Sequence, residues 1–112
     1  DCGNKDATVN TNQRVLEFIK NQDIVSSSVQ LDNAIIVEPC YVGENVSLKN
    51  CVIGPHVSIG ANTTIENAII SNSIIQNDTA IKGLNFTNSM VGNKVKINES
   101  AKQISIGDYN EL

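Results

Sequence analysis

From Val25 onward, an aliphatic residue recurs every five or six positions along the chain. Every third member of this series lies 16 to 18 residues further on, so the series divides into three columns. The spacing does not fit the 3.6-residue period of an α-helix, but it fits very short strands joined by tight corners. Such a repeat predicts a parallel β-helix of about five coils, in which each column is the inner side of one face of a triangular prism. The first column is Val25, Val42, Ile59, Ile75 and Val91; the second is Leu31, Leu48, Ile65, Ile81 and Ile97; the third is Ile36, Ile53, Ile70, Phe86 and Ile104.

A second inward position is expected four residues after each member of these columns, because residues an even number apart in a strand point the same way. Most of these positions are small or aliphatic. They are Val29, Ile35, Cys40, Val46, Val52, Val57, Thr63, Ile69, Ile74, Thr79, Asn85, Met90 and Val95.

The expected corners have a composition of their own. Asn recurs at the middle of five-residue units, at Asn33, Asn50, Asn67, Asn72 and Asn88. Asn adopts left-handed backbone dihedrals more readily than most residues, and its amide can form hydrogen-bonded ladders between stacked strands. The repeat therefore predicts Asn at the corners, with ladders running from coil to coil.

The first part of the chain lacks this repeat. Residues from Asp6 to about Asn21 place Val9, Leu16 and Ile19 on one side, which predicts an amphipathic helix that caps the first coil or packs on an upstream domain. We therefore expect a connecting segment at residues 1–23 and a β-helix domain at 24–112. Residues 101–112 leave the register and are expected to form a terminal cap or a short tail.

Composition agrees with a narrow, regular core. Hydrophobic residues make up 40% of the 112 residues, but aromatic residues only 4%, with no Trp. The net charge of −4 and the lack of a basic cluster argue against nucleic-acid and polybasic membrane partners. The three cysteines show no metal-binding spacing, and Cys40 and Cys51 are expected to be buried thiols in a cytoplasmic, reducing compartment.

The motifs resemble those of the sugar-phosphate nucleotidyltransferases, in particular glucose-1-phosphate thymidylyltransferases that carry a hexapeptide-repeat β-helix after the catalytic domain. The similar features are Asp1-Cys2-Gly3 before the helix, the run from Val42 to Gly83, and the closing Ser105–Tyr109. The resemblance implies an all-β, left-handed parallel β-helix preceded by one α-helix. It further implies an upstream domain that joins a nucleoside triphosphate to a sugar 1-phosphate, in a homo-oligomer.

In that family, the Asp of an Asp-x-Gly motif helps to hold Mg²⁺, and Asp1 stands at the matching place. A hard divalent cation prefers carboxylate ligands and neutralises charge during phosphoryl transfer. The resemblance therefore gives Asp1 a metal role in the intact enzyme. It predicts no catalytic or cofactor-binding residue in this part alone.

Two alternatives remain. Hexapeptide-repeat acyltransferases act at a trimer interface with a His as general base, and His56 is the only candidate. Its position in Ile-Gly-Pro-His-Val instead predicts a solvated corner residue. A binding scaffold without an enzyme is the third hypothesis. Lys82, Lys94, Lys96 and Lys102 could meet an anionic ligand, although scattered surface lysines fit better, and Tyr41 and Leu84 are expected to point outward.

Overall fold

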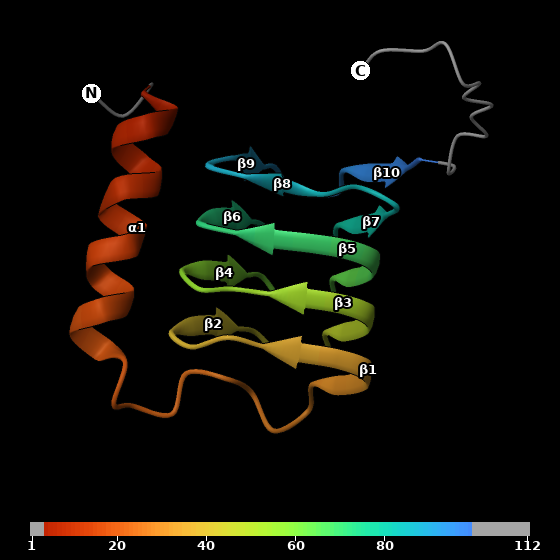
Figure 1. The fold of residues 1–112 in the computed structure, drawn as a ribbon, viewed down its shortest axis with the longest axis horizontal. Helices are drawn as coiled ribbons and strands as arrows, with labels where there is room; N and C mark the ends of the chain where they lie inside the picture. The colour runs from red at the N-terminus through yellow and green to blue at the C-terminus, as the bar shows by residue number, and fades with distance from the viewer. Residues whose placement is uncertain (1–3, 100–112) are drawn as a thin grey trace, which may run out of the picture.

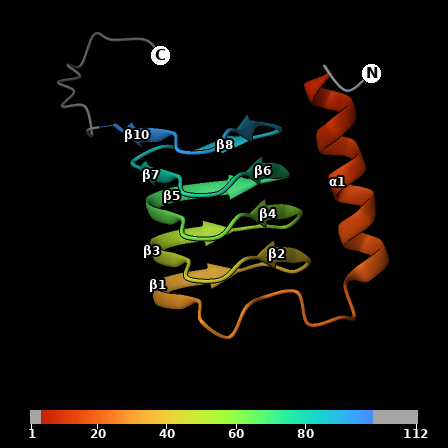
Figure 2. The same cartoon turned by 180° about the vertical axis from the view of Figure 1, so that it is seen from behind.

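The computed structural model describes residues 4–99 of the chain. Short strands stack into a parallel β-solenoid of about four turns, and one α-helix stands beside the stack with its axis along it (Figures 1 and 2). All strand pairs among these residues are parallel. Within this part of the chain, no helix is long and apolar enough to cross a bilayer.

The strands form three faces. The first face consists of β2 (Cys40–Val42), β4 (Val57–Ile59), β6 (Ser73–Ile75) and β9 (Met90–Val91). The second face takes the first halves of β1 (Gln30–Ile36), β3 (Ser47–Ile53) and β5 (Thr64–Ser71), followed by β7 (Ala80–Lys82) and β10 (Lys96–Asn98). The third face takes the second halves of β1, β3 and β5, followed by β8 (Phe86–Thr87).

The register confirms the three predicted columns throughout the described residues. Val42 pairs with Ile59 and Ile59 with Ile75 on the first face. The second and third columns stack in the same way, through Leu48 and Ile65 and through Ile53 and Ile70. The middle members of each column are almost completely buried. Ile104 lies outside the described residues, so the fifth level of the third column is not among these pairs.

The second inward position is confirmed at the corner between the first and second faces, only in part at the corner between the third and first faces, and wrong on the third face. Cys40, Val46, Val57, Thr63 and Thr79 are buried as expected. Ile35 and Ile69, however, are 60% and 57% exposed. Each directly precedes an inward residue of the third column, and neighbours in a strand point to opposite sides. Ala34, Cys51 and Ala68 occupy the inward positions of that face instead.

The inward placement expected for Ile74 and Met90 is wrong for a different reason. The corner between the third and first faces has three residues between Ile53 and Val57 but only two between Ile70 and Ser73. The shorter corner moves the inward position forward by one residue. Ser73 is therefore the buried residue, and its hydroxyl donates to the Ser71 carbonyl at 2.8 Å and accepts from the Ser89 amide at 3.1 Å.

The predicted corner Asn residues all have a left-handed backbone, with φ between 43° and 54°. Because Asn33, Asn50 and Asn67 lie inside β1, β3 and β5, each of these strands bends there and supplies two faces. The Asn33 Nδ2 atom donates to Asn50 Oδ1 at 2.8 Å, and a second ladder joins Asn45 to Asn62 at 3.0 Å. The expected amide ladder is thus present between Asn33 and Asn50, whereas Asn45 and Asn62 lie outside the predicted set.

The helix α1 spans Lys5–Ile19 and begins at Asn4, whose side chain accepts from the Ala7 amide as an N-cap. Val9 and Leu16 are buried, whereas Phe18 is 88% exposed. The helix lies against β4 and β6 and runs along several coils. The expectation that it caps the first coil is therefore wrong.

Replacing Ile65 by Ala should destabilise the protein strongly, whereas the same change at Ile69 should not. Both residues lie in β5, but Ile65 is buried and Ile69 points outward. A buried Ile-to-Ala change leaves a cavity and costs about 2–5 kcal/mol, while exposed positions usually stay within about 0.5 kcal/mol. Urea unfolding at low protein concentration measures both, and equal losses would contradict the inward assignment.

Asn50→Ala should cost more stability than Asn50→Gly. Both substitutions remove the ladder hydrogen bond, but an L-residue without a polar side chain is unfavourable in the left-handed region by about 1–2 kcal/mol, and glycine is not. Thermal unfolding of the two variants should therefore separate the backbone effect from the ladder. A Gly variant that is no more stable than the Ala variant would show that the left-handed backbone conformation at Asn50 does not affect the stability of the protein.

Candidate functional site

The residues singled out from the sequence do not form a metal centre in the described part of the chain. Asp1, the expected Mg²⁺ ligand, lies outside residues 4–99, as does Lys102. Within that range, no group of three or more His, Cys, Asp or Glu residues is placed to hold a metal ion. No step of a reaction can therefore be assigned to a metal held by these residues.

His56 is not the solvated corner residue that the sequence predicted. Its backbone has φ 65°, as at a corner, but only 17% of its side chain is exposed. Its Nε2 atom lies 2.6 Å from Oε2 of Glu17 on α1. The prediction failed because α1 lies beside this corner. Glu17 and His56 are 39 positions apart in the sequence, so no local sequence pattern indicates their contact.

Further polar contacts fix α1 along the prism. The Ser58 hydroxyl on β4 donates to Asn12 Oδ1 at 2.6 Å. Near the start of the helix, Lys5 Nζ donates to the Asn88 carbonyl at 2.8 Å, and Asn88 Nδ2 donates to an Asp6 carboxylate oxygen at 3.2 Å. Contacts at the beginning, middle and end of the helix thus set both its height and its rotation relative to the coils.

Two carboxylates in these contacts are acidified by their partners. The hydrogen bond from His56 lowers the pKa of Glu17, and hydrogen bonds from Lys5 and then Asn88 lower the pKa of Asp6. The hydrogen bonds from His56 and Asn88 come from the coils, so these contacts favour the ionised carboxylates when the helix is in place.

The two buried cysteines are confirmed as buried thiols. Cys40 and Cys51 are free, and burial raises the pKa of each thiol. The Cys40 Sγ atom donates to the Val37 carbonyl at 3.1 Å. Buried thiols of raised pKa carry little thiolate, so these residues are poorly suited to nucleophilic chemistry.

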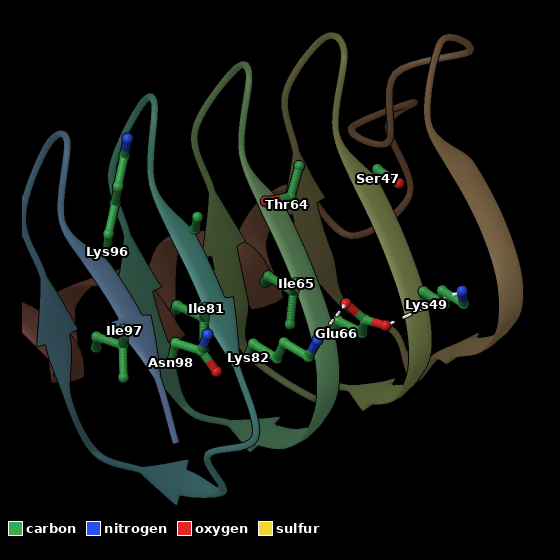
Figure 3. A pocket seen from close by; sticks show the side chains of 11 residues that line it. Ser47, Lys49, Thr64, Ile65, Glu66, Ile81, Lys82, Lys96, Ile97 and Asn98 are labelled. Carbon is green, nitrogen blue, oxygen red and sulfur yellow. Dashed lines mark ion pairs between the residues drawn. The ribbon is translucent and has the colours of Figure 1, made fainter. Parts of the chain in front are cut away.

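The outer side of the second face is hollowed into a trough of about 500 Å³ (Figure 3). Small outward side chains at Ser47, Thr64 and Ala80 leave the space open. Lys96 stands at one end of the trough.

Two apolar side chains outside the core columns were expected to point outward. Leu84 instead packs against the core. Tyr41 is exposed on the first face, as expected.

A row of alternating charge borders the trough. Glu66 lies between Lys49 and Lys82, with N–O distances of 4.0 and 3.8 Å (Figure 3). Together with Lys96, three cations and one carboxylate line this surface, although the chain as a whole is acidic. The arrangement offers positive charge and hydroxyl groups to a small anion. Its lysines are about half exposed, and pairs of this kind contribute little to stability.

The fold and these surfaces define a parallel β-solenoid with a helix held along one side. No model of a known protein family matches the chain, and no curated protein matches it either.

Acid should release α1 before it unfolds the coils. Because the pKa of Glu17 is lowered below 4.5 in the folded protein, its contribution is present above that pH and is lost as the pH falls through the folded pKa. Asp6 acts with the same sign. A detached helix of this length is only marginally stable in water, so the helical circular dichroism should fall as the pH drops below 4.5.

Glu17→Gln should reduce this acid response, because glutamine does not titrate. Arg14→Gln, on an exposed position of the same helix, is the matched control and should leave the response unchanged. An identical pH profile for Glu17→Gln and the unsubstituted protein would show that the His56 contact does not hold the helix.

Proposed function

We propose that this chain is a left-handed, five-coil β-helix module that assembles and stiffens a cytoplasmic sugar-phosphate nucleotidyltransferase. The parent enzyme would join a nucleoside triphosphate to a sugar 1-phosphate, with Mg²⁺ and Asp1, and release pyrophosphate. The chemistry belongs to an upstream catalytic domain, and this chain supplies structure and subunit contacts.

The path of the chain supports the left-handed winding. In Figure 1, the near strands β1, β3 and β5 run toward α1, the far strands β2, β4 and β6 run away from it, and the coils rise from β1 to β10. Seen from the β10 end, a chain that climbs in this way turns clockwise toward the viewer, which is the left-handed sense. A fifth coil on the third face requires Ile104 to stack on Phe86, as the 18-residue spacing suggests.

The observation that carries the proposal is that α1 has two apolar sides. Val9 and Leu16 are buried toward the prism, while Phe18 and Val15 point into solvent. A large aromatic residue exposed to this extent is suited to packing against another domain. Because polar contacts fix the rotation of the helix, a domain that packs on Phe18 would be held at a defined orientation to the coils.

The arrangement of His56 counts against the alternative of an acyltransferase. A general base must reach the hydroxyl or amine that it deprotonates. The His56 side chain is largely covered, and its Nε2 atom is engaged by Glu17.

The coding sequence upstream of Asp1 tests the proposal directly. It should encode a catalytic domain with a glycine-rich nucleotide-binding loop near its start. The purified 112-residue chain, incubated with nucleoside triphosphates, sugar 1-phosphates and Mg²⁺, should release no pyrophosphate, and the full-length protein should. Robust turnover by the chain alone, or an upstream sequence without such a domain, would overturn the assignment.

A further inference from the structure

The third face carries no charge at its outward positions, in contrast to the second face. Its outward side chains in three successive coils are Ile35 and Val37, then Val52 and Gly54, then Ile69 and Ser71. The corner Asn residues border these side chains. The surface is hollowed to about 490 Å³ around the aliphatic stripe. Depletion of charge marks the centre of protein interfaces.

The other two faces are less suited to burial against a partner. The first face is partly covered by α1 through its contacts with β4 and β6. The second face carries the Lys49–Glu66–Lys82 row, and removing three charges from water would be costly. Figure 1 shows the third face in front, with the helix at its edge and no described segment across it.

The stripe is also self-complementary. Ile35, Val52 and Ile69 are directly stacked, one residue per coil. A two-fold axis parallel to the strands and passing beside Val52 would place Val52 on its own counterpart and Ile35 on Ile69 of the second copy. This rotation leaves positions along the strands unchanged, so the column of corner Asn residues would face its own counterpart. Asn50 would meet Asn50, and Asn33 would meet Asn67. Amides pair well with amides because each both donates and accepts.

We propose that the third face binds a second copy of this chain in a two-fold dimer whose prisms run in opposite directions. Residues at the axis of such a dimer face their own counterparts, and a neutral residue such as Val52 avoids like-charge repulsion there. The inference rests on the assembly role in the proposed function but not on the identity of the catalytic domain.

Analytical ultracentrifugation of the 112-residue chain should show a monomer–dimer equilibrium at micromolar concentrations. Val52→Asp should weaken dimerisation at least about tenfold, because it places two carboxylates together at the axis. Thr64→Asp adds the same charge to the exposed second face and is the matched control, which should leave the dimer intact. Circular dichroism of both variants checks that each remains folded.

Disulfide trapping determines the direction of the two prisms. Val52→Cys alone should cross-link two copies, and Ile35→Cys mixed with Ile69→Cys should cross-link each to the other. Ile35→Cys alone should not, because two coils, about 10 Å, separate it from its own counterpart's position. Efficient trapping of Ile35→Cys with itself would overturn the antiparallel arrangement.

A monomer at every concentration, or a dimer that Thr64→Asp disrupts and Val52→Asp does not, would overturn the assignment of this face. A monomer would favour the upstream domain as the partner of the stripe. These outcomes are separate from the pyrophosphate assay and the upstream sequence, so the dimer and the nucleotidyltransferase proposal can fail independently.

Discussion

The stacking of each coil in register on the previous one depends on the length and backbone conformation of its corners. A parallel pairing that slips by one residue turns every inward side chain outward. Here the left-handed Asn residues bend β1, β3 and β5 at equivalent places, so Leu48 meets Ile65 and Ile53 meets Ile70 without a shift. A coil buries its aliphatic residues only against its neighbours, and the corners therefore determine whether the core exists at all.

One corner changes length, and the structure compensates with polar contacts. Between the third and first faces, the later coils have one residue fewer, and Ser73 replaces an aliphatic residue at the inward position. Its hydroxyl is satisfied by Ser71 and Ser89, as a buried polar group requires. Thr63 and Thr79 are likewise buried, and their hydroxyls donate to carbonyls of the next coil at 3.1 and 2.8 Å. At these three inward positions, hydrogen bonds take the place of apolar packing.

The sequence was sufficient to predict the columns and corners because the repeat records them directly. Each coil repeats the same environment, so the aliphatic spacing and the recurring Asn residues reflect inward positions and left-handed dihedrals. The fixed four-residue rule failed at Ile35 and Ile69 because it ignored alternation within a strand that continues through a corner. The place of α1 was not predictable in this way, since Glu17–His56 and Asn12–Ser58 join residues that no periodicity relates.

The contacts of α1 differ in kind from those within the coils. The coils are held by backbone ladders and buried aliphatic columns, which do not depend on pH, whereas the helix combines two buried residues with ionisable contacts near both ends. Conditions that protonate Glu17 and Asp6 can therefore loosen the helix while the solenoid persists. If α1 connects this solenoid to a further domain, the orientation of that domain is set by this small group of polar contacts and not by the core.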